Sequence, residues 1–209
     1  MSETTELAYI HRFVPATDAD RLPVLLLHGT GGDEHDLIDF GHAVAPGAAL
    51  LSPRGNVLEN GMPRFFRRLR EGVFDEQDVI RRAHELADFV AAAQLRYGIA
   101  APVALGFSNG ANIAAALLQL RPEALAGAAL LRAMVPLKEA PTASLAGKPV
   151  LLLSGASDPI VPAAEAALLA ERFAAVGARV SAHTLPAGHG LTQPDLNLTR
   201  SWFDTATRS

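Results

Sequence analysis

The chain has 209 residues and no cysteine, which excludes disulfides, a thiolate nucleophile and a metal site built on cysteine. It also lacks any apolar run near the roughly 20 residues that a membrane-spanning helix needs. Positive charge is not in excess either: the formal net charge is −4, which gives no basic surface for nucleic acid. We therefore expect neither a membrane nor a nucleic acid among its partners.

The first residues, Met1 to Glu6, are polar and acidic, without the basic and apolar regions of a secretory signal. This favours a cytoplasmic protein. Hydrophobic residues at 49% and charged residues at 19% are typical of a globular protein. No internal repeat, low-complexity tract or linker interrupts the chain, so we expect one domain over residues 1–209.

Short apolar runs, typical of strands, alternate with longer amphipathic runs, typical of helices. Strands are predicted at residues 9–14, 23–28, 48–52, 103–107, 127–131, 149–154 and 179–184, and helices at 34–44, 76–97, 109–120, 162–176 and about 194–205. Strands 24–27 and 150–153 are apolar throughout, which indicates helices on both faces of the sheet. The sequence thus predicts an α/β fold with a mostly parallel sheet of about seven strands. Residues 53–75 and 132–148 are predicted to be irregular.

Residues 106–110, Gly-Phe-Ser-Asn-Gly, join a predicted strand to a predicted helix. This is the context of a nucleophile elbow, in which the central serine lies on a sharp, strained turn with its hydroxyl exposed. Small residues two positions before and after the serine let the strand and the helix pass closely. Ser108 is therefore the candidate nucleophile.

A serine hydroxyl needs an adjacent base, and the base needs a third group that fixes its tautomer. In this fold class the partners follow in the order serine, acid, histidine. Of the two later histidines, His183 lies within a predicted strand, whereas His189 lies in a glycine-flanked loop, so His189 is the candidate base. Asp158 follows a predicted strand and is the candidate acid. Taken alone, Asp158 could equally form an Asx-turn or cap the helix near Pro162.

The oxyanion formed on attack needs two positioned N–H donors. One should be the backbone N–H of Asn109, the residue after the nucleophile. Residues 28–32, His-Gly-Thr-Gly-Gly, form a glycine-rich loop after an early strand, and there we choose the N–H of Thr30 as the second donor. A phosphate-binding loop is the competing interpretation, but the Lys-Ser/Thr of a P-loop is missing.

Several residues are candidate substrate contacts with equally plausible structural roles. Met62, Phe65 and Phe66 could line an acyl or aromatic pocket or belong to the core. Arg54 could bind substrate or hold its loop, and Ile160, close to Asp158, is a further candidate. Arginines at 64, 67, 68 and 70 could favour anionic substrates, but such a run is usually a solvated face, and the acidic residues 75–78 could neutralise it.

Histidines at 28, 35 and 42 are seven residues apart, a spacing that raises the possibility of a metal site. However, His28 ends a predicted strand, and no carboxylate–histidine signature of a zinc site accompanies the three. We expect no metal.

These segments resemble the α/β-hydrolase superfamily, and within it the small phospholipase/carboxylesterase family. The resemblance covers nearly the whole chain and is carried by residues 28–32, the elbow at Ser108, residues 155–162 and residues 188–190. Residues 29–34, 53–57, 60–66 and 108–112 are most similar to bacterial carboxylesterase-like members linked with hydroquinone and aromatic-compound metabolism. The resemblance implies an α/β-hydrolase fold without a large lid domain, no cofactor, and a homodimer as a frequent state.

One departure bears on specificity. Relatives that act on acyl-protein or lysophospholipid substrates usually carry glutamine after the nucleophile, where this chain has Asn109. The sequence therefore predicts a serine carboxylesterase for short-chain or aromatic esters, acting through an acyl-enzyme. The alternatives are a thioesterase or lysophospholipase, and a non-catalytic module with this fold that binds a small molecule.

Overall fold

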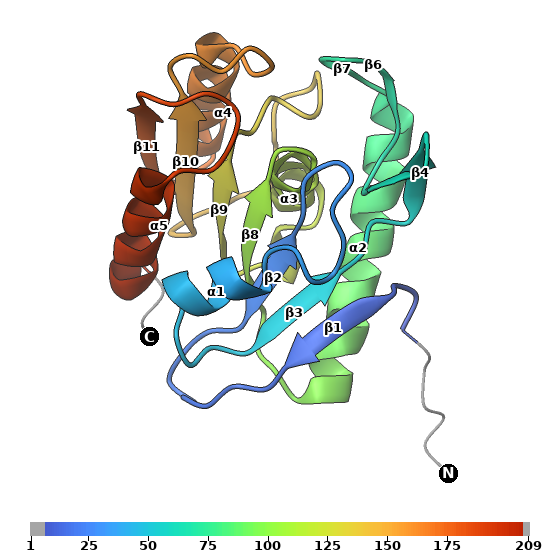
Figure 1. The fold of residues 1–209 in the computed structure, drawn as a ribbon, viewed down its shortest axis with the longest axis vertical. Helices are drawn as coiled ribbons and strands as arrows, with labels where there is room; N and C mark the ends of the chain where they lie inside the picture. The colour runs from blue at the N-terminus through green and yellow to red at the C-terminus, as the bar shows by residue number, and fades with distance from the viewer. Residues whose placement is uncertain (1–6, 207–209) are drawn as a thin grey trace.

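A seven-stranded sheet forms the centre of the molecule (Figure 1), of which the computed structural model describes residues 7–206. The strand order is β1-β3-β2-β8-β9-β10-β11. Their bounds are β1 (His11–Val14), β2 (Val24–Leu27), β3 (Leu50–Pro53), β8 (Val103–Phe107), β9 (Gly127–Leu131), β10 (Pro149–Gly155) and β11 (Arg179–Leu185). β1 pairs antiparallel with β3, and all other neighbours in this sheet pair in parallel. The prediction of a mostly parallel sheet of seven strands is confirmed.

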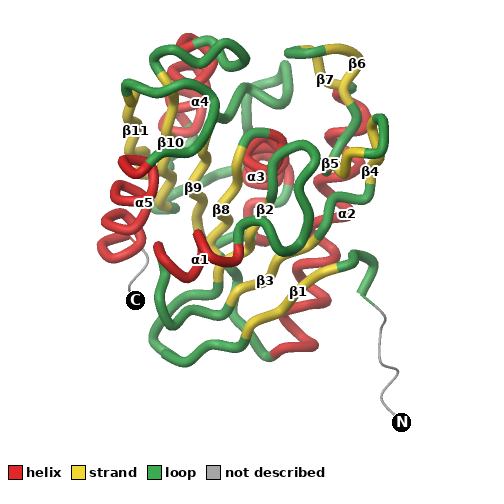
Figure 2. The backbone as a smooth tube through the Cα atoms, viewed as in Figure 1, coloured by secondary structure: helices red, strands yellow, loops and turns green. Residues whose placement is uncertain are grey.

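Helices cover both faces of the sheet, as predicted (Figure 2). The helices are α1 (Ile38–Val44), α2 (Glu76–Tyr97), α3 (Asn109–Leu120), α4 (Ala163–Ala175) and α5 (Gln193–Ala206), with a short 3-10 helix at Pro122–Ala124. Side chains of β2 alternate between two cores. Leu25 and Leu27 belong to the core that α2, α3 and α4 help to form, whereas Val24 and Leu26 belong to the core on the side of α1 and α5. This double burial explains why the central strands are apolar throughout.

Helix α1 begins at Ile38, four residues later than predicted. The preceding residues form turns, in which the Asp33 carboxylate accepts a hydrogen bond from the backbone N–H of His35 (2.8 Å). Such a local side-chain bond gives the backbone an alternative to the helix.

Residues 57–74 form two short hairpins, which we call the double hairpin, where the sequence was predicted to be irregular. They comprise β4 (Val57–Glu59) with β5 (Met62–Arg64), and β6 (Arg68–Arg70) with β7 (Val73–Phe74). In the first turn Asn60 and Gly61 have φ of 53° and 80°. An Asn-Gly pair with positive φ at both positions is a strong hairpin signal, so this part of the prediction was wrong for a reason that the sequence contained. Residues 132–148, all described, contain no helix or strand, as predicted.

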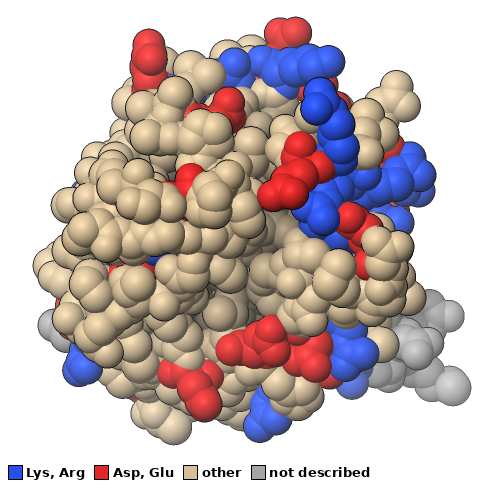
Figure 3. All heavy atoms as spheres, turned by 45° about the horizontal axis from the view of Figure 1, so that its top comes forward, with Lys and Arg blue, Asp and Glu red and all other residues tan. Residues whose placement is uncertain are grey.

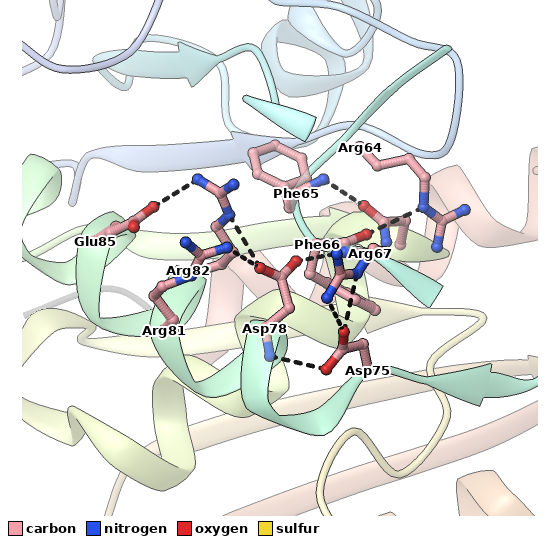
Figure 4. Close-up of polar contacts among 10 residues, drawn as sticks. Arg64, Phe65, Phe66, Arg67, Asp75, Asp78, Arg81, Arg82 and Glu85 are labelled. Atoms are coloured by element: carbon pink, nitrogen blue, oxygen red, sulfur yellow. Dashed lines mark hydrogen bonds and ion pairs between the residues drawn. The ribbon is translucent and has the colours of Figure 1, made fainter. Parts of the chain in front are cut away.

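A buried acid at the start of α2 anchors the double hairpin (Figure 4). Asp78 accepts a hydrogen bond from the backbone N–H of Arg67 (2.7 Å) and pairs with the side chains of Arg81 and Arg82. Asp75 caps α2 by accepting from the N–H of Asp78 (3.3 Å), and it also pairs with the Arg67 side chain. The connection between the two hairpins is therefore fixed to the helix by charged groups.

Burial alone would raise the pKa of Asp78, but the hydrogen bonds from Arg81 and from the Arg67 N–H, with the positive charge of Arg82, lower it below its usual value. A carboxyl with a lowered folded-state pKa stabilises the fold fully above its unfolded pKa. That contribution is lost as the pH falls through the folded pKa.

We therefore expect Asp78→Asn to lower the free energy of unfolding in urea by about 2 kcal/mol at pH 7, because charge-assisted hydrogen bonds are lost from a buried site. The difference in unfolding free energy between the variant and wild type should become smaller at pH values below about 3.9, the ordinary pKa of aspartate. Asp88→Asn is the matched control: its side chain is 73% exposed and pairs with Arg121 at 3.1 Å, so its effect should stay below about 1 kcal/mol. Equal losses in the two variants would contradict the anchoring role.

Candidate active site

Ser108 lies at the sharp turn between β8 and α3, with φ 53° and ψ −113°. Residues other than glycine rarely adopt a positive φ, and such strain persists only where the surroundings fix it. Here the backbone N–H of Ser108 donates to the carbonyl of Leu131 in the neighbouring strand β9 (2.9 Å). The turn is thereby held against the sheet with the serine side chain at its carboxyl edge.

The two glycines of the elbow are required by close backbone contacts. A Cβ on Gly106 would lie 2.5 Å from the carbonyl oxygen of Gly110. A Cβ on Gly110 would overlap the carbonyl of Leu27 at the end of β2. The elbow therefore depends on the lack of side chains where α3 crosses the strand ends.

Ser108, His189 and Asp158 form one hydrogen-bonded chain. The distance from Ser108 Oγ to His189 Nε2 is 2.9 Å, and the distance from His189 Nδ1 to Asp158 Oδ2 is 2.8 Å. The serine and the histidine are 81 residues apart in the sequence. The other histidine that follows Ser108, His183, lies on β11 opposite Leu153 of β10.

Asp158 uses both carboxylate oxygens. Oδ2 faces His189, while Oδ1 accepts from the N–H groups of Ile160 (2.8 Å) and Val161 (3.0 Å). Burial alone would raise the pKa of Asp158, but these two backbone hydrogen bonds and the contact with His189 lower it overall. The turn-forming role and the partnership with the histidine, which the sequence left as alternatives, thus occur together.

A buried ion pair holds the loop that carries His189. Arg132 and Asp195 are both 0% exposed, and two guanidinium nitrogens contact the two carboxylate oxygens at 2.8 and 2.9 Å. Arg132 also donates to the carbonyls of Gly188 (3.0 Å) and Gly190 (3.1 Å), on either side of His189. Its backbone is in the left-handed region, with φ 60°. No role was predicted for Arg132, because an arginine in a predicted irregular segment carries no local signal.

Residues at the end of β5 and just after it form hydrogen bonds with the two segments that carry the candidate oxyanion-hole residues, Thr30 and Asn109. The N–H of Gly31 donates to the carbonyl of Pro63 (2.9 Å), and the guanidinium of Arg64 donates to Thr30 Oγ1 (2.5 Å). The N–H of Phe65 donates to Asn109 Oδ1 (2.8 Å).

Among the described residues, no group accepts a hydrogen bond from the backbone N–H of Thr30 or of Asn109. The latter is one of the first N–H groups of α3, which have no partner within a helix. Both N–H groups therefore remain available as donors.

A cavity of about 360 Å³ opens beside Ser108. Its lining includes Thr30, Asn109, Asn112 and His189 close to the serine, aromatic and aliphatic side chains of Phe74, Phe107, Met134, Ile160 and Val161, and charged side chains of Arg64, Arg68, Glu71 and Arg132. A mixed lining of this kind around the candidate nucleophile suits a small organic ligand.

Of the five candidate substrate contacts, only Ile160 is in the cavity lining. Phe65 and Phe66, which join the two hairpins, are buried in the core. Met62 is partly exposed and lies outside the cavity. Arg54 pairs with the Glu34 carboxylate at 2.5 and 2.7 Å. Phe65, Phe66 and Arg54 thus have structural contacts, whereas Met62 has neither of the two roles considered for it.

The arginine run is not a uniform solvated face. The Arg67 side chain is 66% exposed, but that of Arg64 is 3% exposed and lies over the ring of Phe66 (5.7 Å). Arg64 and Arg68 line the cavity and both pair with Glu59 (3.1 and 2.8 Å). The expectation of a solvated face was therefore wrong for Arg64, which the fold of β5 turns inward.

The three spaced histidines do not converge. His28 is buried, with Nδ1 2.7 Å from the carbonyl of Gly29 and Nε2 accepting from the N–H of Gly55 (3.0 Å). Burial lowers the pKa of His28, which favours the neutral ring that these contacts require. His35 instead contacts Arg12 (3.2 Å). Over residues 7–206 no group of three or more histidine, aspartate or glutamate side chains could hold a metal ion, and no helix there is long and apolar enough to span a membrane.

Gly110→Ala should reduce the free energy of unfolding by about 3 kcal/mol or more, because the new methyl group meets backbone that cannot move aside. Gly190→Ala is the matched control, since a Cβ there has open space around it, and its effect should stay within about 0.5 kcal/mol. Urea unfolding followed by circular dichroism measures both. Near wild-type stability of Gly110→Ala would contradict the close crossing of α3 and β2.

The chain is similar to known hydrolases in sequence and in fold. Residues 10–205 match the model of a family described as Phospholipase/Carboxylesterase. The hydrolase-type protein MhqD of Bacillus subtilis (strain 168) is 45% identical over 185 residues, which cover 88% of this chain and 92% of MhqD.

Among solved structures, the Bacillus cereus carboxylesterase superposes with a TM-score of 0.94 at 44% identity, over 98% of this chain and 100% of the other. A carboxylesterase from Mesorhizobium loti superposes with a TM-score of 0.90 at 32% identity, over 96% and 97%. The chain thus belongs to the phospholipase/carboxylesterase family of α/β hydrolases.

Proposed function

We propose that the protein is a serine carboxylesterase that hydrolyses short-chain or aromatic esters through an acyl-enzyme. The observation that carries this proposal is the hydrogen-bonded chain from Ser108 Oγ through His189 to the buried carboxylate of Asp158. A binding module would have no use for all three groups in this arrangement. Membership of a hydrolase family supports the same conclusion.

In the first half of the reaction, Ser108 Oγ attacks the ester carbonyl while His189 Nε2 takes its proton. Asp158 holds the other ring nitrogen and stabilises the imidazolium that forms. The N–H groups of Thr30 and Asn109 donate to the oxyanion, and each such donor typically contributes roughly 10²–10³ in rate. His189 then gives the proton to the leaving alcohol.

In the second half, His189 takes a proton from water, which attacks the acyl-enzyme, and then returns it to Ser108. The imidazole must keep its position through four proton transfers. The hydrogen bonds from Arg132 to the carbonyls on both sides of His189 support this, because they fix the loop at two points. Positioning of this kind matters because small displacements of catalytic groups reduce rates sharply.

The size of the cavity supports a small acyl group or one aromatic ring. Its volume of about 360 Å³ lies at the lower end of the range for ligand pockets. Phe74, Phe107 and Met134 provide apolar walls.

A fluorophosphonate probe should label the wild-type protein once and should fail to label Ser108→Ala. Ester hydrolysis by Ser108→Ala should fall by roughly 10⁴-fold or more. Ser157→Ala, which removes an exposed hydroxyl next to Asp158, is the control and should be labelled like wild type. Labelling or esterase activity that persists in Ser108→Ala would refute the nucleophile. No labelling of the folded wild-type protein would favour the binding module.

A series of p-nitrophenyl esters from acetate to palmitate, with p-nitrophenyl benzoate as the member with an aromatic acyl group, tests the substrate class. We expect kcat/KM to be highest for the short acyl groups and to fall as the chain outgrows the cavity. Hydrolysis by Ser108→Ala gives the background to subtract. A kcat/KM that rises steadily with chain length would overturn the short-chain assignment and favour the lysophospholipase or thioesterase alternative.

A further inference from the structure

Two arginines on the wall of the cavity share a single acidic partner. Arg64 Nε lies 3.1 Å from Glu59 Oε2, and Arg68 Nε lies 2.8 Å from Glu59 Oε1. Both arginines line the cavity beside Ser108. One carboxylate balances one guanidinium, so this group of three side chains keeps one positive charge. Figure 3 shows the basic side chains gathered in a band along one side of this face, next to acidic ones.

Arg64 already forms hydrogen bonds within the protein through its guanidinium. Its side chain is 3% exposed, and it donates to the carbonyl of Phe66 (3.2 Å) and to Thr30 Oγ1 (2.5 Å). It therefore acts as a fixed positive charge beside residues 28–32, which we call the oxyanion loop, and it has few donor groups left to bind a ligand.

Arg68 is open to a ligand. Its side chain is 27% exposed, and only Nε is engaged, with Glu59. Among the described residues, no group accepts a hydrogen bond from its two terminal nitrogens. The free side of a guanidinium is a planar fork that matches the two oxygens of a carboxylate.

Asn112 offers a second donor from the floor of the cavity. It follows Ser108 by one turn of α3, and it is 5% exposed. The N–H of Met134 donates to its Oδ1 (2.8 Å), which fixes the orientation of the amide. The Nδ2 group is left as a donor without a partner among the described residues, in a side chain that lines the cavity.

The other charged side chains around the cavity leave the donor groups of Arg68 and Asn112 available. Arg132 is neutralised by Asp195 at 2.8 Å, and Asp158 faces His189. Glu71 lines the cavity from the turn between β6 and β7, where it is exposed to solvent. The negative charge of Glu71 repels an anionic ligand. Solvent screens this charge more than it screens the positive charge of the half-buried Arg68.

We propose that the cavity contains a carboxylate-binding subsite and that the substrate is an ester with a second, free carboxylate, such as the monoester of a dicarboxylic acid. Arg68 grips the carboxylate, Arg64 adds positive charge behind it, and Asn112 Nδ2 donates to a further substrate oxygen. This inference rests on the proposed esterase function and names its substrate class.

The test compares monomethyl with dimethyl esters of succinic, glutaric and adipic acid, because the series samples the distance between the ester and the carboxylate. The quantity measured is the ratio of kcat/KM for each monoester to that for its diester. We expect a ratio above one for the best-fitting length. Arg68→Gln should lower it about tenfold to a hundredfold, the range of a charge-assisted hydrogen bond. Glu71→Gln should raise it.

Arg70→Gln is the matched control, because it removes the same charge from the same strand at a residue outside the cavity lining. Its ratio should stay close to that of wild type. The subsite is overturned if no monoester is preferred, or if Arg70→Gln lowers the ratio as much as Arg68→Gln. Diester hydrolysis and Ser108 labelling without such a preference would leave the esterase proposal standing. Absence of both would overturn the two proposals together.

Discussion

The site depends on the close crossing of helix α3 over the end of strand β2. Gly110 has no side chain, and the space that a Cβ would need is filled by the backbone of Leu27. This contact brings the start of α3 next to the loop that follows β2. Ser108, Asn109 and Thr30 therefore line one cavity although Thr30 comes from a separate part of the chain.

Two sets of buried polar contacts complete this arrangement from opposite sides. Arg132 and Asp195 fix the loop of His189 to the end of β9, and the end of β5 ties Thr30 and Asn109 to the double hairpin. Buried charges of this kind are costly to remove from water, and their geometry is set only when every partner is present. Asp195 lies in α5 and Arg64 at the end of β5, but Thr30, Arg132 and His189 lie in irregular segments. In those segments side-chain contacts fix the backbone in place of regular hydrogen-bond ladders.

The double hairpin has both a structural and a chemical role in this account. Its inner residues fill the core and hold the oxyanion loop, while Arg68 faces the cavity with a free guanidinium fork. Specificity can therefore change with a few residues of this segment while the serine, histidine and acid stay in place. Binding and catalytic residues often lie on loops for this reason.

The regular part of the fold could be predicted because period and apolarity are local properties of the sequence. The strands that bury both faces, and the elbow with small residues around Ser108, are examples. Four features escaped prediction: the later start of α1, the hairpins of residues 57–74, the inward position of Arg64 and the buried ion pair of Arg132. The first depends on one side-chain hydrogen bond of Asp33. The first hairpin could have been found from Asn60-Gly61. The burial of Arg64 depends on tertiary contacts that no local pattern encodes.

The most direct test of the central claim is a crystal structure of the protein after reaction with an organophosphonate, which mimics the tetrahedral intermediate. We predict a covalent bond from Ser108 Oγ to phosphorus, with the phosphoryl oxygen about 2.7–3.1 Å from the N–H groups of both Thr30 and Asn109. An adduct on another residue, or a phosphoryl oxygen turned away from these two donors, would contradict the account.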